Sequence, residues 1–88
     1  MKDELIKGTV IDVRTPEEFS EGHYPNATNI PLDNVQQRIN EFIGMPKPIV
    51  AYCRTGNRSG TAVSILKQNG INDAINAGGL DDLKQNIK

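Results

Sequence analysis

The sequence has a single cysteine, no tryptophan, two tyrosines and two phenylalanines among its 88 residues. One cysteine excludes a disulfide within the chain, so any special role of this thiol must come from its neighbours. With so few aromatic side chains, the core must be built from Ile, Val, Leu and Ala. The N-terminus lacks the apolar segment of a signal peptide, and no apolar run is long enough to span a bilayer. We therefore expect a cytoplasmic protein that does not bind membranes.

A strong excess of charge of either sign is also missing. The chain has 10 Lys and Arg residues against 11 Asp and Glu residues, for a net charge of −1, which gives no reason to expect nucleic-acid binding. Hydrophobic residues make up 36 % and charged residues 24 %, a balance typical of a folded domain. We predict that residues 1–88 form one domain with a small core, and that it is a monomer.

Strand and helix patterns alternate along the chain. Short apolar or β-branched runs predict strands at residues 9–13, 28–30, 48–52 and, more weakly, 73–76. A capping box from Thr15 to Glu18 begins a helix that ends near Gly22. Further helices are predicted from residue 33 or 34 to 44, from 58 or 59 to 69, and after the glycine pair at 78–79, with Leu80, Leu83 and Ile87 on one face. This order predicts an α/β fold, with a small parallel β-sheet flanked by helices on both faces.

The second predicted helix carries one apolar stripe that should face the core. Its members recur at helical spacing and are Val35, Ile39, Phe42 and Ile43.

Cys53 follows the clearest strand directly, and a helix begins about five residues later. In parallel α/β folds, ligands bind beyond the carboxyl ends of the strands. A tight strand-to-helix loop can turn its amides inward around an anion, and the helix N-terminus adds a positive dipole end. Gly56 and Asn57 suit the left-handed backbone angles that such a loop requires. Arg54 and Arg58 add positive charge, which lowers the pKa of a thiol and attracts anions. We therefore interpret Cys53 as a reactive thiol rather than a small core residue.

The loop at 53–60, with the sequence CRTGNRSG, resembles the active-site loop of single-domain rhodaneses. Three further stretches are similar to signatures of that family: IDVR at 11–14 with PEEF at 16–19, GHYPNA at 22–27 with NIPL at 29–32, and AGG at 77–79. The sequence departs from the family at Asn26, where Gly is usual, and at Leu83, where an aromatic residue is common. Only eight residues precede the first strong strand, which leaves little room for the family's usual opening strand.

The resemblance implies a sulfurtransferase that carries sulfur as a persulfide on Cys53. The donor would be thiosulfate or another persulfide or polysulfide, and the acceptor a thiol or cyanide, with no cofactor and no metal. The backbone amides of the loop would form the sulfur cradle, and Arg54 and Arg58 would recognise the anion. The implied substrate-binding residues are Arg54, Thr55, Gly56, Asn57, Arg58 and Ser59.

Two other functions compete with this interpretation. Cysteine-dependent phosphatases and arsenate reductases also use a Cys–Arg loop, but with five residues between the two, whereas four separate Cys53 from Arg58. The tighter loop favours sulfur over a tetrahedral phosphate. Rhodanese-like domains that only bind partner proteins lack the cysteine, which is present here.

Several other polar residues have a structural interpretation. We expect Asp12 and Arg14 to pair in a buried or half-buried site rather than to shape the mouth of the active site. His23 has no companion metal ligands and should make a hydrogen bond that stabilises its turn. Ser59 either donates its hydroxyl to the bound sulfur or caps its helix. Asp81 and Asp82 suit the first turn of the last helix.

Overall fold

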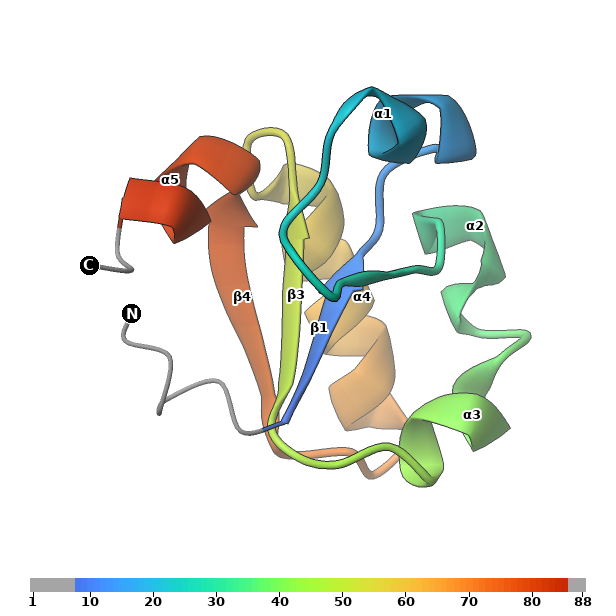
Figure 1. The fold of residues 1–88 in the computed structure, drawn as a ribbon. Helices are drawn as coiled ribbons and strands as arrows, with labels where there is room; N and C mark the ends of the chain where they lie inside the picture. The colour runs from blue at the N-terminus through green and yellow to red at the C-terminus, as the bar shows by residue number, and fades with distance from the viewer. Residues whose placement is uncertain (1–7, 86–88) are drawn as a thin grey trace.

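A four-stranded parallel sheet lies at the centre of the fold, as the computed structural model, which describes residues 8–85, shows (Figure 1). Its strands run in the order β2-β1-β3-β4. They are β1 (Thr9–Asp12), β2 (Thr28–Asn29), β3 (Ile49–Cys53) and β4 (Ala74–Gly79). All five residues of β3 are buried, because this strand has a neighbour on each side and helices above and below.

Helices cover both faces of the sheet, as the sequence predicts. They are α1 (Pro16–Glu21), α2 (Leu32–Val35), α3 (Ile39–Ile43), α4 (Asn57–Gln68) and α5 (Leu80–Gln85). Because side chains alternate along a strand, Ile11 and Ala51 pack with Leu66 of α4 on one face. Val50 and its same-face neighbours pack with Leu83 of α5 on the other. Leu83, one of the departures from the family pattern, is 1 % exposed and so fills its site as a core residue.

The predicted helix at 33–44 is wrong as a single element. The chain forms two short helices instead, and the backbone of Arg38, at φ −107° and ψ 24°, lies outside the helical region between them. The break changes the phase of the apolar stripe. Val35 and Phe42 are buried as predicted, but Ile43 is 58 % exposed and does not belong to the core.

Element ends differ from the prediction by small amounts. The capping box is confirmed: the Thr15 hydroxyl accepts from the backbone N–H of Glu18, and the Glu18 carboxylate accepts from the N–H of Thr15. Helix α4 begins at Asn57 rather than at residue 58 or 59. Strand β4 runs beyond its predicted end, because Gly79 pairs with Cys53 after a register shift. Ile87, predicted on the apolar face of the last helix, lies outside the described residues.

A buried polar network supports the carboxyl end of β1. Arg14 Nη2 lies 2.7 Å from Asp12 Oδ2, and both side chains are almost fully buried, which confirms the expected pairing. The Tyr52 hydroxyl donates to the same carboxylate at 2.8 Å, and Arg14 also donates to the carbonyl of Gly22 at 2.7 Å. His23 Nδ1 lies 2.9 Å from the Phe19 carbonyl oxygen, as expected of a turn-stabilising residue. These contacts hold the segment after α1 against the sheet.

The described part of the chain has no helix that combines the length and the apolar character needed to cross a membrane.

Candidate active site

The Sγ atom of Cys53 lies inside a cradle of hydrogen-bond donors. Cys53 is the last residue of β3, and the chain turns back so that α4 begins only four residues later. Sγ accepts from the backbone N–H of Gly56 at 3.0 Å, and from the backbone N–H and the hydroxyl of Ser59 at 3.5 Å each. Gly56 has φ 99°, the predicted left-handed conformation. The same prediction is wrong for Asn57, which already belongs to the helix.

The cradle makes the thiol acidic. Burial raises the pKa of Cys53, but hydrogen bonds from the Ser59 hydroxyl and from the amides of Ser59, Gly56 and Thr55 outweigh it, and the pKa falls from 9.0 to about 7. The leading favourable contributions therefore come from the loop itself rather than from Arg54 and Arg58, which the sequence analysis emphasised. Close to neutral pH, a large fraction of Cys53 is the nucleophilic thiolate.

Glu18 of α1 binds the two arginines of the loop, a role that the sequence analysis missed. Arg58 donates from Nη1 to Oε1 at 2.7 Å and from Nη2 to Oε2 at 3.1 Å. Arg54 Nε lies 3.6 Å from Oε2, while its side chain is 68 % exposed. The hydrogen bond from Arg58, supported by the backbone N–H of Thr15, lowers the pKa of Glu18 from 4.5 to about 2, so this carboxylate stays charged.

Asn76 of β4 is the second residue that the sequence analysis missed. Its Oδ1 accepts from the Ser59 hydroxyl at 2.6 Å and from the backbone N–H of Gly78 at 2.9 Å, and its Nδ2 donates to the carbonyl of Gly56 at 3.0 Å. Ser59 does not cap α4, since Gly56 stands at the N-cap position without a side-chain hydrogen bond. Its hydroxyl instead lies 2.6 Å from Asn76 Oδ1 and 3.5 Å from Sγ, and its single proton serves one of these two acceptors at a time.

The glycine pair lets β4 approach the loop closely. A Cβ atom on Gly79 would collide with the carbonyl oxygen of Arg54, and one on Gly56 would lie 3.2 Å from the Cα of Gly78. Glycine at these positions therefore allows backbone to pack against backbone beside the thiol.

The predicted site residues come together in one loop, although not all of their side chains face Sγ. The side chains of Thr55 and Asn57 are exposed, and the carbonyl of Asn57 accepts from the hydroxyl of Thr61 within α4. Thr55 contributes its amide to the cradle. Within residues 8–85, no three His, Cys, Asp or Glu side chains are grouped to hold a metal.

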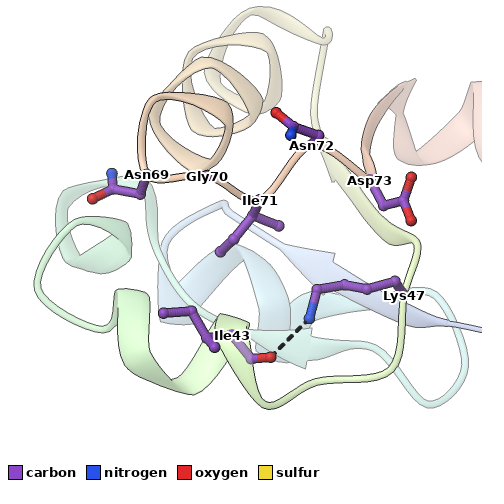
Figure 2. Close-up of a pocket in the computed structure, with 7 residues that line it drawn as sticks. All are labelled: Ile43, Lys47, Asn69, Gly70, Ile71, Asn72 and Asp73. Atoms are coloured by element: carbon purple, nitrogen blue, oxygen red, sulfur yellow. Dashed lines mark hydrogen bonds between the residues drawn. The ribbon is translucent and has the colours of Figure 1, made fainter.

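A pocket of about 520 Å³ lies at the opposite end of the sheet, where β3 and β4 begin (Figure 2). The residues that line it are Ile43, Lys47, Asn69, Gly70, Ile71, Asn72 and Asp73. Lys47 Nζ donates to the carbonyls of Phe42, Ile43 and Met45, so it caps the end of α3. None of these lining residues belongs to the Cys53 loop.

Comparisons with known proteins agree with the geometry of the loop. Residues 1–86 match the rhodanese-like domain family. The chain is 45 % identical over 73 residues to protein YqhL of Bacillus subtilis, a match that covers 83 % of this chain and 57 % of YqhL. It is 42 % identical over 74 residues to the thiosulfate sulfurtransferase PspE of Escherichia coli, which covers 83 % of this chain and 71 % of PspE.

A solved structure of a rhodanese with anions from E. coli superposes with a TM-score of 0.77 at 40 % identity, and the match covers 84 % of this chain and 88 % of that one. The family match over nearly the whole sequence and the similar fold lead to one conclusion: this chain belongs to the rhodanese-like domain family.

Proposed function

We propose that this protein is a sulfurtransferase that carries a sulfane sulfur as a persulfide on Cys53. The observation that carries the proposal is the cradle around Sγ, with three hydrogen-bond donors within 3.5 Å and a thiol pKa of about 7. Such a site stabilises a negatively charged sulfur atom, and both the thiolate and the persulfide carry a negative charge on sulfur. The relationship to PspE, whose name records thiosulfate sulfurtransferase activity, supports the same reaction.

The reaction proceeds in two steps through a covalent intermediate. The Cys53 thiolate attacks the outer sulfur of thiosulfate, the S–S bond breaks, and sulfite leaves with the electron pair. A thiolate acceptor or cyanide then attacks the outer sulfur of the persulfide, and the Cys53 thiolate leaves with its pair. Each leaving group is a stable anion, so neither step needs a general acid. Because the chain has one cysteine, the acceptor must come from outside it.

The residues of the loop have separate roles in this proposal. The amides of Thr55, Gly56 and Ser59 hold the sulfur anion, together with the Ser59 hydroxyl. Arg54, which is largely exposed, meets an anionic donor at the mouth. Arg58 holds the loop closed through Glu18. Asn57 is the first residue of α4, the helix whose first turn brings the backbone N–H of Ser59 to Sγ.

Intact-protein mass measurement tests the proposal. Thiosulfate should add the mass of one sulfur atom, and cyanide should remove it and release thiocyanate. Sulfate, an anion of similar shape without a sulfane sulfur, should add nothing. Cys53→Ser should abolish loading and thiocyanate release. Sulfur transfer that survives in this variant would show that Cys53 is not the carrier.

A further inference from the structure

The two positive side chains of the Cys53 loop share one negative partner. Glu18 lies against both Arg54 and Arg58. Arg14, the other nearby cation that acts on Arg58, is itself paired with Asp12. Glu18 therefore offsets part of the positive charge that the two arginines give the loop.

The carboxylate of Glu18 is held firmly in this position. It accepts two hydrogen bonds from Arg58, and its Oε1 also accepts from the backbone N–H of Thr15 at 3.0 Å and the Thr15 hydroxyl at 3.2 Å. The side chain is only 20 % exposed. A bidentate pair occupies the planar fork of Arg58, so that fork is not free to bind a second anion. Arg54, at 68 % exposed against 35 % for Arg58, is left as the more accessible cation.

A loop whose arginines are partly neutralised by a carboxylate suits some donors of sulfane sulfur better than others. Thiosulfate carries two negative charges, and a carboxylate beside its binding site repels it. An alkyl persulfide, RSSH, carries one negative charge when ionised and none when protonated. In its transfer the thiolate attacks the outer sulfur, the S–S bond breaks, and the alkyl thiolate leaves with the electron pair.

We propose that Glu18 is a specificity-determining residue, and that it makes the site favour donors with at most one negative charge, such as alkyl persulfides, over dianionic thiosulfate. The inference rests on the proposed sulfurtransferase function and adds the charge class of the preferred donor.

Three variants separate the charge of Glu18 from its structural role. Glu18→Gln removes the charge and keeps the capping box, because Gln also serves at this helix position. Glu17→Gln makes the same change in net charge on an exposed neighbour in α1. Glu18→Asp keeps the charge but shortens the side chain that reaches Thr15 and Arg58.

The first measurement is the ratio of the alkylation rates of Cys53 by iodoacetate, an anion, and iodoacetamide, which is neutral. This ratio reports the electrostatic potential at the thiolate, and the single cysteine makes it specific to the site. We expect Glu18→Gln to raise the ratio about five-fold at low salt, the size of a charge interaction of about 1 kcal/mol, and less at high salt. Glu17→Gln and Glu18→Asp should stay close to the unaltered protein.

The second measurement compares kcat/KM for thiosulfate with that for 2-hydroxyethyl persulfide. Glu18→Gln should raise the preference for thiosulfate by a similar factor. Equal changes for both donors, or the same change in Glu18→Asp, would show a purely structural role and overturn the proposal. If neither donor loads the unaltered protein, the sulfurtransferase function itself is wrong. The unaltered protein gives a further check that needs no variant: a steep preference for iodoacetate at low salt would mean that Glu18 does not offset the arginines.

Discussion

Removal of the Ser59 hydroxyl tests the origin of the thiol's acidity. This hydroxyl lies 3.5 Å from Sγ and is the largest of the favourable contributions that lower the pKa of Cys53 to about 7. In Ser59→Ala the amides of Gly56 and Ser59 remain, and Asn76 keeps the hydrogen bond from Gly78. The variant therefore removes the hydroxyl beside Sγ together with its 2.6 Å hydrogen bond to Asn76, and it leaves the other hydrogen bonds of the loop in place.

The size of the effect follows from the strength of a hydrogen bond to a charged group. Loss of about 1.5 kcal/mol changes an acid dissociation constant about ten-fold. At pH 7 a thiol with a pKa of about 7 is about half ionised, and a ten-fold weaker acid is ionised to about 10 %. We therefore expect Ser59→Ala to slow alkylation of Cys53 by iodoacetamide about five-fold at pH 7, while the rate above pH 9 changes little.

The assay is the pH dependence of the alkylation rate from pH 5 to 10. Its midpoint should rise by about one pH unit in Ser59→Ala. Ser64→Ala is the matched control, because Ser64 is an exposed serine of the same helix, and its midpoint should equal that of the unaltered protein. An unchanged midpoint in Ser59→Ala would refute the role of the hydroxyl. A midpoint near 8.5 in the unaltered protein would refute the acidic thiol altogether.

Further predictions concern the charged residues of the loop and the competing reaction. Arg54→Ala should raise KM for thiosulfate more than it lowers kcat, and the effect should shrink at high salt, since this arginine is exposed. Equal losses in the rates of alkylation by iodoacetate and by iodoacetamide would contradict its role in anion recognition. Arg58→Ala should lower both kcat and the melting temperature, because the loop loses its hydrogen bonds to Glu18. Arg58→Lys should restore little of either, since a point charge cannot replace the planar guanidinium. Thermal melts and steady-state kinetics of the two variants measure these effects. The folded pKa of Glu18, about 2, lies below its ordinary 4.5, so its contribution to stability is complete above pH 4.5 and is lost as the pH falls toward 2; acid unfolding of Glu18→Gln should lack this component. Hydrolysis of an aryl phosphate should be negligible beside sulfur transfer, and efficient hydrolysis that disappears in Cys53→Ser would favour the phosphatase interpretation.

Much of the fold could be predicted because its signals are local. The apolar run before Cys53, the capping box at Thr15 and the glycine pair each occupy a few adjacent residues. The helix at 33–44 was wrong because a periodic stripe assumes an unbroken helix, and no Gly or Pro marks the break near Arg38. The exposure of Ile43 follows from the same break.

The loop could be located from the sequence, but Glu18 and Asn76, the residues that hold it from other elements, could not. Glu18 is 40 residues from Arg58, and Asn76 is 17 residues from Ser59. The members of each pair meet because the carboxyl ends of β1, β3 and β4 lie on the same side of the sheet. The sequence indicates where these strands end, but it does not give the strand register that decides which residues meet there. The role of Glu18 in the loop was also hard to predict because the capping box already explains a glutamate at that position. Its carboxylate serves the helix and the loop together.

The supports of the loop also connect the reactivity of the thiol with the completion of folding. Asn76 holds the Ser59 hydroxyl from the final strand, and Glu18 holds Arg58 from the first helix, so these two contacts form only when distant segments have docked. A chain that has formed β3 and α4 alone would hold a cysteine without the contacts from β4 and α1. Rapid alkylation at neutral pH is thus expected of the assembled site, and the single cysteine reports on these long-range contacts without an added label.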